Sequence, residues 1–427
     1  MSIIPPAIPN VIPIPLPKLS VRGFYDQYFD FVGKTEAPRL FHRWCAISGI
    51  AALLERQCWL PFGHSSIYPN MYVMLMGNPG TRKDSSINIV KGCLERQGFS
   101  RFSADRTSKE RFLMDMRSSY MNDATGEDEE EFLELPLDAN SARYVIAGEF
   151  LDFAGKGNIE FVTMLGKLWD NIPSYEHPKL HGRSIMLQNP TVNMLAGNTP
   201  QNFTLAIPPE ALGSGFMSRL ILVQGETTGV KITFPESPSE VAKKVLDARI
   251  ADIIKEVRGR FTLSTAAKEI CDRLYRGYTN IEDYRFAHYS TRRFTHLLKL
   301  TLCFAATRCT TEISQSDVLQ ANTLLYYTEV KMPKALGEYG KSKNSDVANS
   351  VLEIIRGSKT PVNAKRLWKN VAQDLNRQEE LLEILKGLMS AGKIKNTETG
   401  FVPHHERVTV WEDGLLDKGF LTIEEMA

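Results

Sequence analysis

Residues 71–85 read Met71-Tyr-Val-Met-Leu-Met-Gly77-Asn78-Pro79-Gly80-Thr81-Arg82-Lys83-Asp84-Ser85. An apolar run of strand-like composition is interrupted by Gly-Asn-Pro-Gly and continues into a segment of helical character. A strand, a glycine-rich loop and a helix in this order aim loop amides and a helix N-terminus at anionic oxygens. Gly77 and Gly80 allow the tight backbone path, and Lys83 stands where the lysine of a phosphate-binding loop contacts the outer phosphates. The stretch predicts a nucleotide-phosphate site, with an ordinary turn as the alternative.

Two positions depart from the usual phosphate-loop pattern. Arg82 replaces the glycine that normally precedes the lysine, and Asp84 stands where a Ser or Thr hydroxyl normally binds magnesium. The chemistry at Lys83 is therefore predicted to be unusual at its metal-binding side.

Composition and charge limit the class of protein. The chain has 427 residues and a formal net charge of +1, so any contact with nucleic acid must come from a local basic patch. No run approaches the roughly 18 apolar residues of a membrane span, and the N-terminus lacks a signal-peptide pattern. Six cysteines without a CxxC pair are typical of a reducing compartment. We expect a cytoplasmic protein with no membrane partner.

Polar residues end or precede three further apolar, strand-like runs. Residues 143–148 end at Glu149, which in a strand beside the phosphate loop would bind magnesium and polarise water, or would begin a helix. Residues 190–197 end at Asn198, whose amide would orient the attacking water or cap a turn. Arg219 directly precedes the fourth run, either as a surface residue or as a contact to a phosphate held by a neighbouring chain.

A short basic segment lies between two strand-like runs. Lys179, His181 and Arg183 surround a glycine and predict a hairpin with a basic tip. Three such side chains on one tip suit contact with nucleic-acid phosphate, although a solvated hairpin without a ligand has the same pattern.

The chain divides by composition into six parts. We expect a proline-rich extended arm at 1–20, an N-terminal helical segment at 21–68, an α/β core at 69–235, a helical lid region at 236–335, a winged-helix domain at 345–410 and an acidic tail at 411–427. His42, Arg39 and Arg43 of the helical segment are expected to be solvated. In the winged-helix domain we expect helices at 346–356, 363–373 and 378–390 and a β-wing at about 393–410. The third helix carries Glu379, Glu380 and Glu383, which favour a structural or protein-contact role at least as much as DNA binding.

Together, these motifs resemble the motor core of MCM-type AAA+ helicases and the related hexameric helicases of phages and small DNA viruses. The resemblance covers about residues 70–330. Its five motifs are a Walker A loop at 77–83, a Walker B ending at Glu149, a sensor 1 at Asn198, an arginine finger at Arg219 and a sensor 2 helix with Arg292. The basic hairpin falls just before sensor 1, where these families place a DNA-contacting hairpin.

The resemblance implies an AAA+ P-loop NTPase that binds ATP and Mg²⁺ at an interface of a homo-hexamer. It implies that Lys83 holds phosphate, Glu149 activates water, Asn198 positions it, and Arg219 and Arg292 contact phosphate from the adjacent protomer or from the lid. Lys179, His181 and Arg183 would then move single-stranded DNA through the ring, and the tails would contact a primase or other replication proteins.

One departure from the family pattern concerns the magnesium ion. Gly148 replaces the Walker B aspartate, and Asp84 replaces the loop hydroxyl. We hypothesise that Asp84 compensates by binding Mg²⁺ together with Glu149, since this ion prefers oxygen ligands. Two alternatives stay open: the Asp84 carboxylate repels phosphate and the site is weak, or Ser85 supplies the hydroxyl.

The sequence favours an ATP-dependent hexameric DNA helicase of a phage or other mobile element. An AAA+ initiator or helicase loader that binds ATP and DNA without unwinding is the alternative. A catalytically impaired scaffold is the third possibility.

Overall fold

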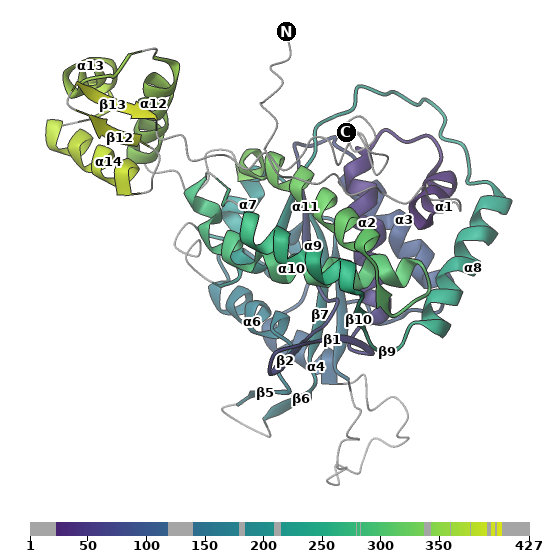
Figure 1. Cartoon of the computed structure of the whole chain (residues 1–427). Coiled ribbons are helices and arrows are strands. Elements are labelled where there is room, and N and C mark those ends of the chain that lie inside the picture. The colour runs from purple at the N-terminus through teal and green to yellow at the C-terminus, as the bar shows by residue number, and fades with distance from the viewer. Residues whose placement is uncertain are drawn as a thin grey trace. The chain divides into compact units, whose positions relative to one another are not determined.

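The computed structural model describes residues 23–117, 140–178, 184–208, 215–336 without 279 and 282, and 343–403 without 359, 376, 391–393 and 398. These residues form two compact units, one up to residue 336 and one from residue 343 (Figure 1). The described part of the chain is mixed α/β and contains 14 α-helices and a parallel sheet, as expected for the α/β class.

A four-stranded parallel sheet forms the centre of the first unit (Figure 1). In sheet order its strands are β4 (Ala142–Ala147), β7 (Thr191–Asn198), β3 (Tyr72–Met76) and β8 (Leu220–Gln224). All residues of β3 and β7 are buried. Strands covered on both faces read as continuous apolar runs, which is why the sequence located all four.

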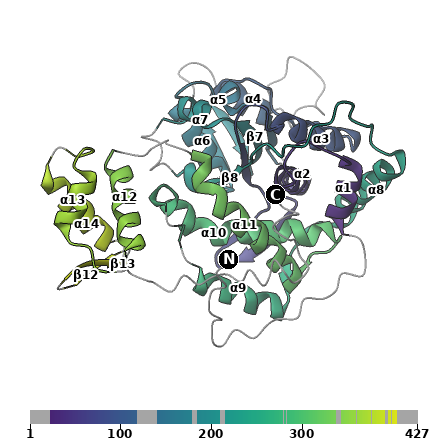
Figure 2. The same ribbon diagram turned by 90° about the horizontal axis from the view of Figure 1, so that it is seen from above.

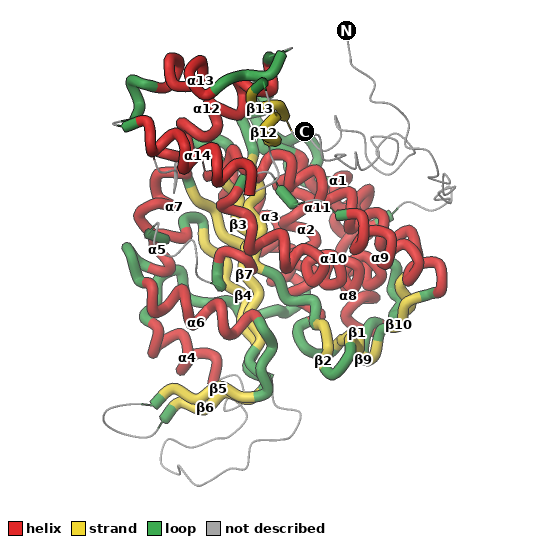
Figure 3. Tube along the Cα trace, turned by 60° about the vertical axis from the view of Figure 1, so that its left-hand side comes forward, coloured by secondary structure: helices red, strands yellow, loops and turns green. Residues whose placement is uncertain are grey.

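Helices cover both faces of this sheet (Figure 3). α2 (Arg39–Leu54) and α3 (Lys83–Arg96) pack on one face, and α5 (Phe150–Ala154), α6 (Ile159–Trp169) and α7 (Pro200–Ala206) lie on the other. α4 (Lys109–Arg117) contacts β6 (Ile185–Gln188), which pairs with β5 (Ser174–His177) as an antiparallel hairpin. This arrangement leaves the carboxyl ends of β3, β4 and β7 at one edge of the sheet.

The remaining helices of the first unit come late in the chain. They are α8 (Glu240–Glu256), α9 (Thr265–Gly277), α10 (Ala287–Thr307) and α11 (Gln315–Leu336). α10 packs along α11, and α8 lies beside α1 (Phe24–Val32), which is distant from it in the sequence (Figure 2). Short parallel pairings join β10 (Thr262–Leu263) to β11 (Glu312–Ile313), and the 3-10 turns η3 (Met217–Arg219) and η4 (Tyr284–Phe286) precede β8 and α10.

The N-terminal segment is not helical throughout, and that part of the prediction is wrong. After α2, the chain forms β1 (Cys58–Phe62) and β2 (Ser65–Ile67), an antiparallel hairpin. β1 also pairs in parallel with β9 (Gly259–Arg260), about 200 residues later in the chain. The pairing with β9 leaves no local signal, whereas the β1–β2 turn has one in Gly63, at φ +58° between the paired residues Phe62 and Ser65.

His42 and Arg43 are buried in α2, so the prediction that they are solvated is wrong, whereas Arg39 is exposed as predicted. His42 Nε2 lies 3.1 Å from Thr35 Oγ1, and burial, with a smaller contribution from Arg39, lowers the pKa of His42 to about 4. The Arg43 guanidinium lies 5.0 Å from the centre of the Tyr25 ring. Aromatic side chains of α1 thus accommodate a polar patch on α2.

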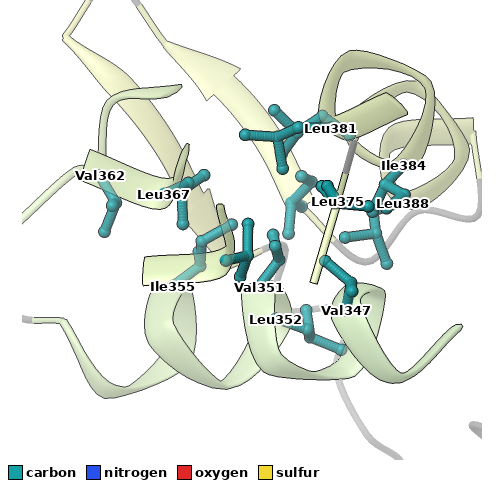
Figure 4. Packing of buried hydrophobic residues seen from close by; sticks show 13 residues of the cluster. Val347, Val351, Leu352, Ile355, Val362, Leu367, Leu375, Leu381, Ile384 and Leu388 are labelled. Carbon is teal, nitrogen blue, oxygen red and sulfur yellow. The ribbon is translucent and has the colours of Figure 1, made fainter. Parts of the chain in front are cut away.

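The second unit has its own apolar core (Figure 4). It contains α12 (Lys343–Gly357), α13 (Ala364–Val371), α14 (Gln378–Ser390) and the antiparallel pair β12 (Ile394–Thr397) and β13 (Gly400–Pro403). Val351 and Ile355 of α12 are fully buried in a cluster that also contains Leu367 and Leu385. The predicted helices at 346–356, 363–373 and 378–390 are present, with small shifts at their ends.

Among the described residues, no helix combines the length and apolar character needed to cross a lipid bilayer.

Candidate nucleotide site

The predicted phosphate loop follows β3 at the carboxyl edge of the sheet, where ligands of open α/β sheets usually bind. We expected the strand that leads to Glu149 to lie directly beside the loop strand. This expectation is wrong, because β7 lies between β3 and β4. Met76, the last residue of β3, pairs with Asn198 at the end of β7. The ends of three strands therefore bring Lys83, Asn198 and Glu149 to one edge.

Lys83 begins α3, but its side chain turns back into the loop. Its ammonium donates to Gly77 O at 2.9 Å and lies 3.5 Å from Asn78 O and from Thr81 Oγ1. Partial burial lowers the pKa of Lys83, and the carboxylates of Glu149 and Asp84 oppose that shift. The loop thus holds a cation whose nearest anionic partners belong to the same site.

The loop takes a backbone path that normally favours glycine. Gly80 has φ +88°, and Arg82 is left-handed with φ +60° and ψ +33°. This conformation explains why glycine is usual before the lysine. Here Arg82 donates from Nε to Glu36 Oε2 at 2.7 Å, and Glu36 Oε1 accepts from Ile232 N at 2.7 Å. These two bonds, the Ile232 one first, lower the pKa of Glu36.

A cleft opens beside the loop. Its volume is about 530 Å³, and it is lined by Glu36, Gly80, Arg82 and residues 227–233. Pockets for small ligands commonly measure roughly 300–1,000 Å³. Asn78, Pro79, Asp84 and Ser85 are exposed around the loop, so its outer side is open to a ligand.

Asp84 lies directly against Gly148. A β-carbon added to Gly148 would lie 2.9 Å from Asp84 Oδ1 and 3.3 Å from its Cγ. The carboxylate of Asp84 therefore occupies the space that a side chain at position 148 would need. It stands next to Glu149, which lies at the start of α5.

Glu149 contacts an amide that the sequence did not single out. Asn202 Nδ2 donates to Glu149 Oε2 at 3.2 Å. Asn202 is the third residue of α7, whose N-cap Thr199 accepts from Asn202 N. A polar side chain in the first turn of a helix that starts at this sheet edge was the available signal.

Asn198 itself is fully buried. Its Oδ1 accepts from Thr199 N at 3.0 Å, and its Nδ2 lies 4.0 Å from Met74 Sδ. These contacts correspond to the capping role that the sequence left open. Its strand nevertheless separates the Lys83 loop from the Glu149 strand.

The two candidate arginines lie at the opposite edge of the sheet. Arg219 precedes Leu220, which pairs with Tyr72 at the start of β3, whereas the phosphate loop follows Met76 at its end. Five strand residues at about 3.3 Å each separate these ends by about 16 Å. Arg219 and Arg292 both contact Asp170, at the end of α6. One chain therefore brings Lys83, Asp84 and Glu149 together but keeps Arg219 and Arg292 apart from them.

The predicted basic tip, with Lys179, His181 and Arg183, lies outside the described residues. The strands that would carry it are present, with Ser174 opposite Gln188 and His177 opposite Ile185. The expected arm at 1–20 and the acidic tail at 411–427 also lie outside them.

No protein-family model matches the chain, and no curated protein sequence matches it.

Proposed function

We propose that this chain is the ATPase subunit of a hexameric DNA helicase that moves along single-stranded DNA. The observation that supports the proposal is that the candidate phosphate loop and the candidate arginines lie at opposite ends of the strands of one sheet. Lys83 and Glu149 lie at the carboxyl edge and Arg219 at the amino edge, about 16 Å apart along the strands. A single nucleotide contacts both sets only when two copies meet, which a ring of identical chains provides.

The proposed chemistry uses residues already in place. The Lys83 ammonium and the loop amides bind the phosphates, and Glu149, held by Asn202, polarises the attacking water. Asn198 is proposed to contact the same water through its Nδ2. Arg219 and Arg292 of the adjacent copy stabilise the charge that develops on the phosphate.

The carboxylates present fit a magnesium ion. Asp84 fills the side-chain space left open at Gly148, which precedes Glu149 in the chain, and both carboxylates act electrostatically on Lys83 of the loop. Among the described residues, no group of three His, Cys, Asp or Glu side chains is arranged to hold a metal. Mg²⁺ is commonly held by one or two carboxylates together with substrate phosphates, and it would neutralise phosphate charge there.

Contact with DNA is assigned to the β5–β6 hairpin, whose tip carries Lys179, His181 and Arg183. A ring-shaped motor needs basic side chains only where the DNA passes, at its centre. A net charge of only +1 is therefore compatible with a nucleic-acid motor. Contact with replication partners such as a primase is proposed for the tails.

Unwinding of a forked DNA substrate, measured with ATP hydrolysis, tests this proposal. Lys83→Ala and Arg219→Ala are each expected to abolish both activities, because each removes one half of the shared site. Lys179→Ala with Arg183→Ala is expected to abolish unwinding while ATP binding persists. Lys255→Ala, on an exposed position of α8, serves as the control. ATP and duplex DNA binding without unwinding would favour an initiator or loader, and absence of ATP binding would indicate an inactive scaffold.

A further inference from the structure

One carboxylate holds both arginines of the proposed shared site. Arg219 Nε donates to Asp170 Oδ1 at 3.1 Å, and a second nitrogen of the same guanidinium donates to Oδ2. Arg292 NH1 lies 3.4 Å from the same Oδ1 atom. The pair comes from two distant elements, since Arg219 precedes β8 and Arg292 belongs to α10.

The ring of Trp169 forms the floor of this cluster. Each guanidinium carbon lies 5.7 Å from the centre of that ring, and the buried ammonium of Lys299 lies 4.3 Å from it. Lys299 donates to Tyr68 O at 2.9 Å and to Asn70 Oδ1 at 2.5 Å, so its own bonds go to neutral oxygens. Three cationic side chains thus surround one aromatic ring and one carboxylate.

The position of Asp170 is not explained by helix α6. Asp170 is the C-cap of that helix, where the helix dipole disfavours a negative charge. The two arginines offset this cost by their attraction to the Asp170 carboxylate. The carboxylate in turn reduces the repulsion between the two guanidiniums. Consistent with this, the positive charge of Arg219 contributes to lowering the pKa of Arg292, after partial burial, and Asp170 opposes the shift.

The two arginines differ in freedom. The Arg219 side chain is 9% exposed and also donates to Gly215 O, whereas the Arg292 side chain is 36% exposed. Loss of the carboxylate would therefore leave Arg219 in its buried position and let Arg292 turn toward water. Two guanidiniums and one carboxylate leave one net positive charge. A phosphate could therefore bind to the same pair of arginines.

We propose that Asp170 is a positioning residue that keeps Arg219 and Arg292 together as a two-arginine contact for the phosphate bound by the adjacent copy. The inference rests on the proposed function, because it assumes that a second chain supplies that phosphate. Asp170 acts only through the arginines and therefore in the chain that donates them.

A mixing experiment with full-length chains tests this role. Chains with Lys83→Ala lack the lysine of the phosphate loop but keep both arginines. Chains with Arg219→Ala keep the loop lysine but lack the proposed arginine finger. Neither is expected to hydrolyse ATP alone, and their mixture should recover activity. Asp170→Asn is then introduced into one partner at a time, and kcat and KM are measured for both mixtures.

In the Lys83→Ala chain, Asp170→Asn is expected to lower kcat by about tenfold or more with KM unchanged, since small misplacements of catalytic groups have effects of this size. In the Arg219→Ala chain the same change should have little effect. Asp170→Glu should restore part of the loss, and Asp252→Asn, on an exposed position of α8, is the control for charge removal.

Equal losses in both partners would show a general structural role and overturn the inference, as would an unchanged kcat when the donor carries Asp170→Asn. A parental mixture that recovers no activity would instead reject the shared site, and the role of Asp170 with it. The two failures are therefore distinguishable.

Discussion

At the scale of single residues, the side chain of Asp84 occupies space that is open only because position 148 is glycine. A β-carbon there would lie 2.9 Å from Asp84 Oδ1, closer than side chains normally approach. A side chain at position 148 and the present position of the Asp84 carboxylate therefore exclude each other. In this chain the carboxylate is supplied by Asp84 of the loop and not by residue 148.

This dependence predicts the behaviour of exchanged residues. Asp84→Ser alone should weaken Mg²⁺-dependent nucleotide binding, because one of two oxygen donors is lost. Gly148→Asp alone should also weaken it, because two carboxylates then crowd one position. The double variant should recover most of the binding. Titration of a fluorescent ADP analogue with and without Mg²⁺ measures the effect independently of turnover.

Two results would contradict the proposed dependence between Asp84 and Gly148. One is an unchanged Mg²⁺ dependence, together with undiminished ATP turnover, in a chain with Asp84→Ala. The other is a double variant no better than the single ones. Hydrolysis that is absent from both the wild type and Asp84→Ala would instead indicate that the Asp84 carboxylate repels phosphate.

Lys299 makes a prediction about pH. Burial lowers its pKa to about 7, while Asp170 opposes the shift. In the unfolded chain its pKa is about 10.4, so between these values the unfolded state binds the extra proton. Stability should therefore rise with pH across this window, by on the order of 1 kcal/mol per unit from this residue.

Urea unfolding at pH 7 and pH 9 measures this contribution. The stability of the wild type relative to Lys299→Met should increase between the two values, because the variant carries no titrating group there. Lys255→Met, at an exposed position, should show no such change. An equal pH dependence in all three proteins would show that Lys299 keeps an ordinary pKa.

At the scale of elements, β7 and α7 supply two asparagines with different surroundings. Asn202, in the first turn of α7, donates to Glu149, whereas Asn198 at the end of β7 is fully buried and accepts from Thr199 N. Asn202→Ala should lower kcat about tenfold with little change in melting temperature, because it releases the Glu149 carboxylate that we propose polarises water. Asn198→Ala should lower the melting temperature, because it leaves Thr199 N without this acceptor.

Gln201→Ala, on the exposed neighbour of Asn202, is the matched control. The pH profile of kcat adds a readout that a structural effect would not move, since loss of the amide changes the surroundings of the Glu149 carboxyl. If Asn202→Ala lowers stability and leaves the kcat profile unchanged, its contact with Glu149 is only structural.

The elements also show which features were predictable. The apolar runs at 72–76 and 191–198 located buried strands correctly, since strands covered on both faces need no distant partner to be recognised. The pairing of β1 with β9 was not predictable because β9 is distant in sequence, although the β1–β2 turn at Gly63 was a local signal. Asp170 and Asn202 were missed for a similar reason. Each is an ordinary polar residue near a helix end, and only folding brings it to Arg219 or to Glu149.

At the scale of the whole molecule, the proposed function and the separation of Lys83 from Arg219 together predict that ATP hydrolysis requires two or more chains to assemble. If each site is completed by a second copy, ATP hydrolysis per chain should rise with chain concentration and level off when association is complete. A finger supplied by a neighbour is worth on the order of 10³-fold or more in related enzymes, so a dilute chain should be nearly inactive.

Mass photometry in parallel with ATPase assays links the two quantities, because the concentration of half-maximal activity should match that of ring formation. The Arg219→Ala variant should form the same rings, because it keeps the loop that is proposed to bind ATP. It should remain inactive at every concentration, because it lacks the guanidinium that is proposed to complete the neighbouring site. Adding single-stranded DNA should shift wild-type association to lower concentration if the basic hairpins meet one strand at the centre. A wild-type chain that hydrolyses ATP at full rate as a monomer would require both edges of the sheet to reach one nucleotide. The register of β3 with β8 opposes this, because it holds the two edges a strand length apart.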